Sequence, residues 1–538
     1  MQGNKIYSAM LTIKFTPNAV LLISVAAMLV PVIWIETAVL LHTHGTIAYP
    51  LDDTFIHMSV AKTLAFDHVW GISKYSFESA SSSPLYTILL AVVFLVTGAH
   101  LVTPLLINIL AAIVFLAVLQ RWLIRQGLTA MNRLLIMLAV IFLSPLPLLV
   151  ISGMEHTLQL LFCFLFIYSF SASAHGKLPW QVYLYGILMV TTRYETMSMV
   201  AIACLFLLFR RQWWSAVKLG SISLLPVILF GLYAMSKGSY FMPNSVLLKS
   251  GMPPLTFEGL TAFFFNVFWD KLLFASQDYN ILTAQRLLLI LPLVYLISFD
   301  AIRRHPAYGY TLIILLGAVL GHVSFAYYSP YPRYEAYLVG CSLPVIGVLV
   351  LRHGLNILPI KIKGSEWIAW SLLVMLAIPL LFRAATTFGN AAQCCINIYD
   401  QQYQMAQFVH SYYNKEPVAF NDIGAVSYYS EGKKLDLMGI ASLDVLKAKR
   451  MRLWNSNFAD SLSRRDNIRL AIVYDKWFSP FLLQRWKKIA TWEIRNNVIA
   501  GDDIVSFYSV NKVDSATLRR HLQEYQPSLP GGVVVRYY

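Results

Sequence analysis

Charged side chains are scarce in this sequence. Asp, Glu, Lys and Arg together make up 13% of the 538 residues, whereas hydrophobic residues make up 57%. A soluble globular chain carries about 25% charged residues. The shortage excludes an ordinary soluble protein and predicts that most of the chain lies in lipid.

Cysteine and acidic residues are also few. The five cysteines show neither CxxC spacing nor nearby histidine partners, which argues against a zinc site and a disulfide framework. They are Cys163, Cys204, Cys341, Cys394 and Cys395. The net charge of +15 arises mainly from short Lys and Arg clusters between apolar runs. This pattern is typical of cytoplasmic loops, so we expect no nucleic-acid partner.

Long apolar runs, by contrast, are abundant. A membrane-spanning helix needs about 20 apolar residues, and the sequence predicts about eleven such crossings. The runs cover residues 19–41, 101–119, 134–151, 157–174, 178–192, 195–209, 217–234, 284–299, 308–327, 334–351 and 366–383. The first run has no cleavage site before the polar loop that follows, and it is interpreted as a retained span.

The basic clusters orient these runs. With a cytoplasmic N-terminus, all of them fall on the inner side, as the positive-inside rule requires. They are Arg121/Arg125/Arg133, Lys177, Arg210/Arg211/Lys218, Arg303/Arg304 and Arg352/Lys361/Lys363. The apolar run 84–98 is short, and counting it as a crossing would invert every later loop. We therefore expect a re-entrant or interfacial helix that Pro84 begins.

This orientation places the unusual polar segments on one outer face. They are residues 42–83, Ser152–His156, Arg193–Glu195, 235–283 and Tyr327–Glu335, together with the tail. The tail has mixed charge and short apolar stretches of strand length, which predict a small α/β domain. The sequence thus divides into a transmembrane domain at 1–384 and an extracytoplasmic α/β domain at 385–538.

The first outer loop contains two adjacent carboxylates, Asp52 and Asp53, followed by apolar residues at helical spacing. These predict an amphipathic helix on the membrane surface, with either aspartate as its N-cap. At most one of the two can cap the helix, and the other must be solvated, paired or functional. His57 lies one turn after Asp53 and is placed to join it.

Other ionisable groups interrupt the later apolar runs. Glu155 sits at a membrane boundary, where an ordinary loop acid is the simple alternative. Arg193 and Glu195 break a long apolar stretch, which indicates function or a structural ion pair. Two further cations follow on the same face, Lys249 after Asn244 and Arg333 beside His322. Lys249 and Arg333 are suited to phosphate or to lipid headgroups.

The order of these motifs resembles the membrane-embedded GT-C glycosyltransferases, and within them the cell-wall arabinofuranosyltransferase-type branch. The resemblance rests on Asp52-Asp53, Ser152-Gly153-Met154-Glu155, Thr192-Arg193-Tyr194-Glu195, Pro243-Asn244-Ser245 with Lys249, and Arg333-Tyr334. In the tail it includes Asn421-Asp422-Ile423-Gly424 and Leu435-Asp436-Leu437-Met438-Gly439. Tyr194 departs from the pattern, which leads us to expect Pro there, and no Gly follows Glu195.

The resemblance implies an inverting glycosyltransferase of a bacterial inner membrane, with its site and tail facing the periplasm. A sugar would pass from a polyprenyl-phosphate donor to a cell-envelope glycan or lipid acceptor. Asp52 is the expected base, and Asp53 is its alternate. Arg333, Lys249 and Arg193 would hold the donor phosphate. The substrate-binding residues would be His57, Glu155, Glu195, Asn244 and His322. The motifs require no cofactor and leave a divalent cation open.

Two other function classes use the same features. A transporter or flippase of lipid-linked sugars would bind its cargo through these polar residues without cleaving it. The absence of an internal repeat, and the collection of polar residues at one face rather than at mid-bilayer, argue against this alternative. A sensor whose tail binds a ligand would explain the tail but would leave Asp52 and Asp53 without a role.

Overall fold

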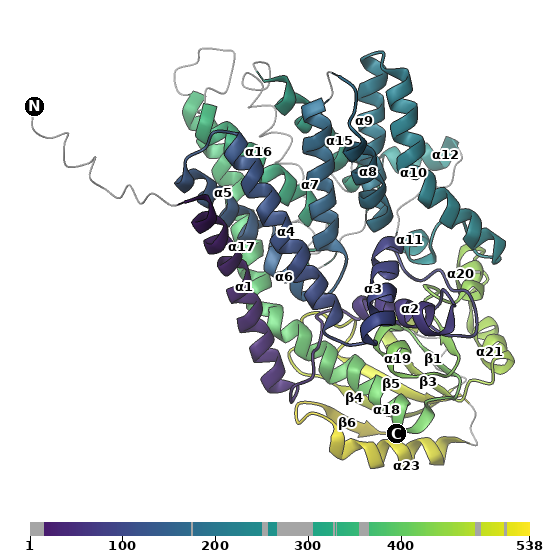
Figure 1. The fold of residues 1–538 in the computed structure, drawn as a ribbon. Helices are drawn as coiled ribbons and strands as arrows, with labels where there is room; N and C mark the ends of the chain where they lie inside the picture. Colours follow the sequence, from purple (N-terminus) through teal and green to yellow (C-terminus); the bar gives the residue numbers. More distant parts are fainter. Residues whose placement is uncertain are drawn as a thin grey trace, which may run out of the picture.

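The computed structural model shows a bundle of long helices joined to a small α/β domain (Figure 1). It describes residues 16–173, 176–249, 257–265, 305–326, 329, 331–353, 365–478, 486–510 and 514–538. Every predicted span that lies within these ranges is occupied by helix. The predicted span 284–299, with Arg303 and Arg304 after it, lies outside the described residues.

The bundle contains both long and short apolar helices. Within the described ranges, six helices are long and apolar enough to cross a membrane. The elements are α1 (Pro17–His42), α4 (Thr103–Arg125), α5 (Ala130–Leu143), α6 (Leu146–Ile151), α7 (His156–Ser173), α8 (Trp180–Thr192), η2 (Tyr194–Thr196), α9 (Met197–Phe209), α10 (Trp213–Ser236), α11 (Asn244–Lys249), α12 (Phe257–Phe265), α15 (Pro306–Phe325), α16 (Ala336–His353) and α17 (Ser365–Ile398).

One predicted span is broken in two. The run 134–151 forms α5 and then the short α6, with Ser144 and Pro145 between them. Proline has no N–H to donate and its ring crowds the preceding turn, so an α-helix does not continue through it without a kink or a break. Helix α6 ends at Ile151 and leads directly into the segment that carries Glu155.

The short run 84–98 forms α3 (Pro84–Thr97), a helix of 14 residues with proline in its first turn. At about 1.5 Å per residue it is about 21 Å long, less than the ~30 Å hydrocarbon core. Its length fits the expected re-entrant or interfacial helix. Its depth in a bilayer stays a prediction.

The helix after the two aspartates is present as α2 (Asp53–Asp67), but its environment differs from the expected one. The prediction of an amphipathic helix on the membrane surface is wrong. Helix α2 is buried on nearly all sides, and Thr54 to Ala61 form an unbroken buried stretch. It packs between α3 and α19 (Gly424–Tyr429) of the tail. The tail covers the face that the sequence suggested would meet water.

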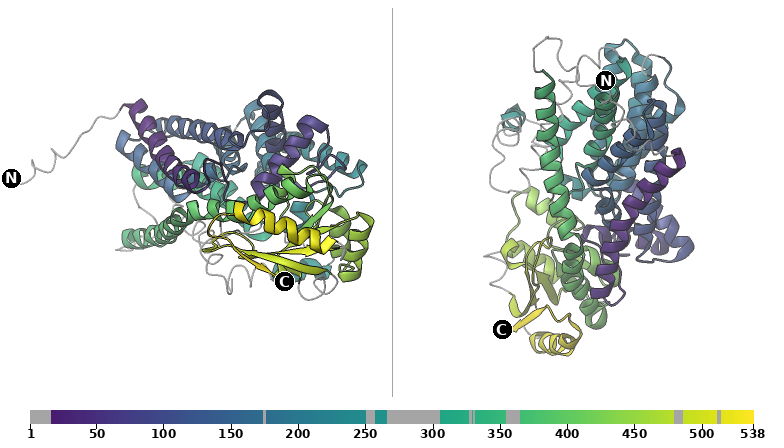
Figure 2. Two further views of the ribbon diagram at one scale, coloured as in Figure 1. Left: turned by 90° about the horizontal axis from the view of Figure 1, so that it is seen from below. Right: turned by 90° about the vertical axis from the view of Figure 1, so that its left-hand side faces the viewer.

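The bundle and the tail are joined by helix. The long α17 continues without a loop into η4 (Tyr399–Tyr403) and α18 (Gln404–Tyr413). The predicted domain boundary between residues 384 and 385 therefore falls inside α17. In the right-hand view of Figure 2 this continuous helix runs along the bundle and enters the tail domain.

The tail contains a six-stranded sheet in the order β2-β1-β3-β5-β4-β6. Its first three strands are parallel, and β5, β4 and β6 are joined in antiparallel pairs. The strands are β1 (Val418–Phe420), β2 (Lys434–Asp436), β3 (Leu470–Val473), β4 (Lys487–Glu493), β5 (Ile504–Ser509) and β6 (Val534–Tyr537). The helices around it are α19, α20 (Leu443–Arg450), α21 (Ser456–Arg465), α22 (Asp475–Phe478), α23 (Ser515–Tyr525) and η6 (Gln526–Ser528).

The sheet lies across one end of the bundle (Figure 2, left). This is the end where α1 ends and α4 begins, since the Tyr428 hydroxyl donates to the carbonyl of Ala99, just before α4, at 2.6 Å. Arg121 and Arg125 occupy the opposite end of α4. The tail and the basic loop after α4 therefore lie at opposite ends of the bundle, the arrangement that the charge pattern predicts.

Candidate functional site

A cavity of about 350 Å³ lies where the bundle meets the tail. Segments far apart in the sequence contribute to its wall, including Asp53 of α2, Met154 before α7, Ser245 of α11 and Gly321 of α15. The tail contributes Ile440, from the loop after β2. Most of the lining side chains are apolar, so the few charged groups in the wall interact in a setting with little water to screen them.

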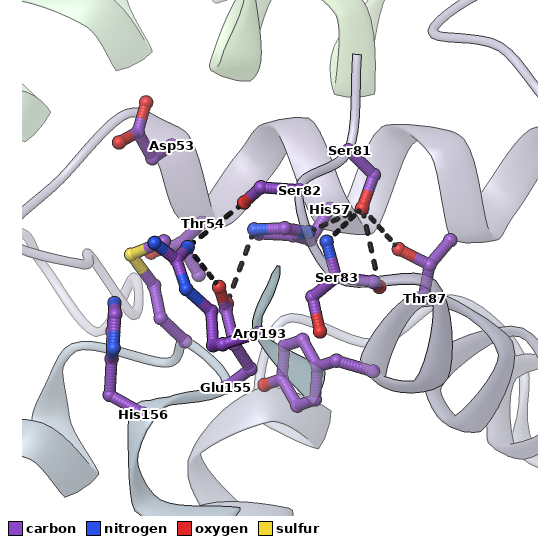
Figure 3. A network of polar contacts seen from close by, with 12 residues as sticks. Asp53, Thr54, His57, Ser81, Ser82, Ser83, Thr87, Glu155, His156 and Arg193 are labelled. Carbon is purple, nitrogen blue, oxygen red and sulfur yellow. Dashed lines mark hydrogen bonds and ion pairs between the residues drawn. The ribbon is translucent and has the colours of Figure 1, made fainter. Parts of the chain in front are cut away.

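Glu155 is the centre of one charged cluster (Figure 3). The carboxylate is fully buried, and Arg193 Nη1 donates to its Oε1 at 2.8 Å, while His57 Nε2 is 3.3 Å from its Oε2. Burial alone would raise the pKa of Glu155, but His57 and Arg193 outweigh it and lower that pKa to about 2. Glu155 is therefore ionised at neutral pH.

Arg193 links this cluster to the cavity. Its Nε donates to Glu195 at 2.8 Å and its Nη1 to the Ser82 hydroxyl at 3.0 Å. The backbone explains the placement, since α8 ends at Thr192 and Arg193 is extended (φ −152°) before η2 begins. Both Arg193 and Glu195 line the cavity, so the expected ion pair exists and also faces the candidate site.

A second ion pair joins Asp53 to Arg333. Arg333 Nη2 donates to Asp53 Oδ2 at 2.7 Å, and Nη1 lies 2.7 Å from the thioether sulfur of Met154, a weak acceptor. The Arg333 Nε has no hydrogen-bond partner among the described residues. Arg333 is almost fully buried, yet part of its hydrogen-bonding capacity is left over.

The two arginines meet at one aromatic ring. The guanidinium carbons of Arg333 and Arg193 lie 4.7 and 5.1 Å from the centre of the Tyr334 ring, which also lines the cavity. Each contact is a cation–π interaction, which desolvation strengthens. Tyr334 thus holds two positive charges close together, with Arg193 in the cavity wall and Arg333 paired to Asp53 of that wall.

Asp52 lies elsewhere. It makes no side-chain capping bond to its own helix α2, contrary to one expectation from the sequence. Instead its carboxylate oxygens accept the N–H groups of Gly424 and Ala425, at 2.6 and 2.8 Å, and so cap α19 of the tail. A Cβ at Gly424 would overlap the backbone carbonyl oxygen of Asp52, which explains the glycine. Asp52 holds the tail against α2 and is outside the cavity wall.

The Asp52 environment also changes its acidity. Burial raises the pKa of Asp52 above its ordinary value, and the nearby carboxylate of Asp422 raises it further. Asp422 is itself partly buried and accepts hydrogen bonds from Gln402 and Tyr474. Two partly buried carboxylates therefore lie together where the tail meets α2.

The remaining predicted site residues lie around the cavity in different ways. Asn244 is buried, its N–H donates to the Ser79 carbonyl at 3.0 Å, and Ser245 beside it lines the wall. His322 of α15 is buried with its Nδ1 3.3 Å from the Tyr337 hydroxyl, and its neighbour Gly321 lines the wall. Lys249 ends α11, and its side chain lies outside the described residues.

Several residues of the site were not singled out from the sequence. Ser82 belongs to a run of three serines directly before α3, and this run was an available signal. Tyr334 was named only as part of the Arg333-Tyr334 motif, and Ile440 only follows the motif that ends at Gly439. Neither residue gave a sequence signal of its own. The structure also holds a buried ion pair between Glu335 and Arg383 that joins α16 to α17.

No group of three or more His, Cys, Asp or Glu side chains that could hold a metal ion occurs among the described residues. All five cysteines are free thiols, and four of them are buried.

Comparison with known proteins addresses the fold. A domain of unknown function (DUF8728) matches residues 396–508, within the tail. No curated protein matches the chain. Among solved structures, the crystal structure of ArnT from Cupriavidus metallidurans bound to undecaprenyl phosphate matches with a TM-score of 0.52. The match has 12% sequence identity and covers 91% of this chain and 98% of ArnT.

This chain has a GT-C fold. The match covers nearly the whole of both chains, and together with the apolar helices it identifies a helical membrane protein. The predicted GT-C resemblance is confirmed at the level of the fold. The arabinofuranosyltransferase-type branch and the count of eleven crossings stay predictions.

Proposed function

We propose that this protein is an inverting glycosyltransferase that moves a sugar from a polyprenyl-phosphate donor to a cell-envelope glycan or lipid acceptor. The observation that carries the proposal is the cavity itself, whose wall contains the carboxylate of Asp53 and the guanidinium of Arg193, with Arg333 paired to Asp53 beside it. The cavity lies between membrane helices and an α/β domain. The GT-C fold supports it, as does the undecaprenyl phosphate bound to ArnT.

The chemistry requires a base for the acceptor. The acceptor hydroxyl attacks the anomeric carbon, the bond from that carbon to the phosphate oxygen breaks, and the proton passes to a carboxylate. The sequence favoured Asp52 for this role and Asp53 as its alternate. We assign the base to Asp53, since it lines the cavity, and give Asp52 the task of positioning the tail. A single displacement without a covalent intermediate inverts the anomeric centre.

The leaving group is a lipid phosphate, which needs positive charge rather than an acid. Arg333 and Arg193 supply that charge, and Lys249 is assigned to the same task. Arg333 is suited to it because its Nε is without a partner in the described structure and its Nη1 meets only a thioether. Phosphate oxygens are stronger acceptors than a thioether sulfur, so a phosphate would complete these contacts.

The surrounding groups position the charges. Glu155 holds Arg193 from behind, and His57 and Ser82 complete its network. Glu195 lines the cavity beside Arg193 and is assigned to the substrate together with Asn244. His322 lies behind Gly321, and we assign it a supporting role on that side. No step in this scheme requires a cofactor.

We place the protein in a bacterial inner membrane, with the cavity and tail on the periplasmic side. The charge pattern supports this orientation. Lys415 and Arg125 are both exposed. Arg125 ends α4, whereas Lys415 follows α18 in the tail, which contacts the opposite end of α4. Single cysteines at these positions should react oppositely with an impermeant reagent in intact cells, with label at 415 and protection at 125. The reverse result would contradict the orientation.

The competing function is a transporter of lipid-linked sugars, which would bind the same donor without cleaving it. Purified protein in liposomes that contain an undecaprenyl-phosphate sugar, with an envelope glycan extract as acceptor, separates the two. A glycosyltransferase releases undecaprenyl phosphate and produces glycosylated acceptor, both measurable by mass spectrometry. Donor that moves between leaflets and stays intact would favour the transporter.

A further inference from the structure

Four polar atoms next to the cavity are buried without a hydrogen-bond partner in the described part of the chain. They are the hydroxyl oxygens of Tyr194 and Ser245 and both side-chain polar atoms of Asn244. The three residues are 4%, 5% and 1% exposed. Buried polar groups are nearly always hydrogen-bonded, because an unpaired group loses its contacts with water and gains nothing in return.

These atoms belong to the wall of the candidate site. Tyr194 and Ser245 line the cavity, and Asn244 directly precedes Ser245 at the start of α11. Met242 and Val246, on either side of this pair in the sequence, line the cavity as well. Tyr194 stands between Arg193 and Glu195 in the chain, so its phenol belongs to the segment that carries the charged cluster.

We propose that Tyr194, Asn244 and Ser245 form a subsite that binds the hydroxyl groups of the donor's sugar ring. The inference rests on the proposed glycosyltransferase function and specifies which residues read the sugar. Two hydroxyls and a primary amide supply both donors and acceptors and carry no charge. A neutral sugar ring presents hydroxyl groups with the same dual capacity, whereas a phosphate would find no positive charge in these three residues.

The subsite is also separate from the phosphate contacts. The arginines that we assign to the phosphate are held by Asp53, Glu155 and Glu195, and none of these bonds involves Tyr194, Asn244 or Ser245. Side-chain rotamer changes commonly accompany binding, so hydroxyls with little exposed surface can turn toward a ligand in the cavity. Removing one of these hydroxyls should therefore affect sugar recognition and leave phosphate binding intact.

The test compares Tyr194→Phe and Ser245→Ala in the purified full chain in nanodiscs. Tyr185→Phe is the matched control, because Tyr185 lies on α8, is only partly buried and is not part of the cavity wall. The probes are bare undecaprenyl phosphate and undecaprenyl phosphates that carry arabinofuranose, glucose or mannose. Titration measures the dissociation constant of each, and the glycosylated lipid that the wild type binds best is then used with its single-deoxy analogues.

Tyr194→Phe and Ser245→Ala should each weaken binding of the glycosylated lipid about tenfold, the effect of one hydrogen bond. Binding of bare undecaprenyl phosphate should not change. The loss should vanish with the deoxy analogue that lacks the hydroxyl read by the mutated residue. Equal losses for both lipids, or no loss for either in both variants, would overturn the subsite. A wild type that binds the lipids without transferring the sugar to an acceptor and releasing undecaprenyl phosphate would instead overturn the proposed function.

Discussion

The adjacent residues Asp52 and Asp53 belong to different regions of this molecule. Asp53 lines the cavity and pairs with Arg333, whereas Asp52 lies against the tail and accepts two backbone N–H groups of α19. The cavity region holds carboxylates with arginines, in pairs that a phosphate or a proton can rearrange. The tail contact instead pairs one carboxylate with backbone N–H groups, whose positions are set by the helix that carries them.

This difference teaches that adjacency in sequence says little about a shared role. Asp52 has helical dihedral angles (φ −64°, ψ −28°) and immediately precedes α2, so its side chain and that of Asp53 leave the helix in different directions. One of them faces the bundle and the other the tail. The two adjacent carboxylates, which suggest a single site in the sequence, therefore have two separate roles. Asp53 is assigned to chemistry, and Asp52 holds the tail against α2.

The largest expected effect distinguishes the role of Asp53 from that of Asp52 directly. Asp53→Asn should lower kcat for sugar transfer by about 10²–10⁴-fold, since an amide cannot accept the proton of the acceptor hydroxyl. Asp52→Asn, the matched change at the neighbouring residue, should keep kcat within about tenfold of the wild type, because Asp52 lies outside the cavity wall and an Asn keeps one acceptor oxygen for α19. The measurement is transfer of labelled sugar by purified protein.

The reverse ranking would restore Asp52 as the base, as the sequence suggested. Full activity in both variants would remove both aspartates from the chemistry and favour the transporter.

A substitution at Arg333, the partner of Asp53, tests the cavity region in this comparison. Arg333→Ala should raise the apparent KM for the lipid-phosphate donor by about 10–100-fold, a loss typical of one charge-assisted contact in a buried site. Arg333→Lys should retain part of the affinity, because a lysine keeps the charge but not the fork of donors. Arg464→Ala, at an exposed position in the tail, serves as control. Unchanged donor kinetics in Arg333→Ala would remove this residue from the phosphate site.

Much of the bundle was predictable because lipid imposes a simple rule on the sequence. Apolar runs and basic clusters located the helices of the described structure, and the same pattern brought Glu155, Arg193 and Arg333 to one end. Arg193 and Glu195 were visible because an ion pair inside an apolar stretch is costly and needs a reason. Pro84 indicated where α3 begins.

The details of the site depend on contacts that no local pattern encodes. The partner of Asp52 is Gly424, 372 residues later, so the sequence around Asp52 could not show that it caps a helix of the tail. The burial of α2 has the same cause, since the tail covers it. Tyr194 was noticed only as a departure from a family pattern, and its place in the cavity wall required the fold.

The tail contact can be weakened without touching the cavity. Gly424→Ala should destabilise the protein by about 1–3 kcal/mol, because the added Cβ would lie 2.7 Å from Asp52 Cγ and must push α19 away from α2. Asp52→Ala should cost about 1 kcal/mol through loss of the cap. Gly389→Ala is the control, since nothing lies within 4 Å of a Cβ there. Thermal unfolding of purified protein measures all three, and an unaffected Gly424→Ala would contradict the close contact.

The smallest expected effect is a dependence of the tail contact on pH. Burial, and next to it the Asp422 carboxylate, raise the pKa of Asp52 in the folded protein above the ordinary value of about 3.9. The folded state therefore binds a proton more tightly than the unfolded state, so this contribution to stability is complete below about pH 4 and is lost as the pH rises through the folded pKa. Asp422→Asn removes one of the two charges and should flatten the decrease in melting temperature between pH 5 and 8 by about 1 °C, because the shift per kcal/mol is small in a chain of 538 residues. Burial also raises the pKa of Glu78, to about 7, so part of the decrease should persist in that variant.

Melting curves of wild type and Asp422→Asn across this range, each in the same nanodiscs, provide the measurement. Identical slopes would show that Asp422 does not set the charge state of Asp52, and the contact would then rest on the backbone hydrogen bonds alone.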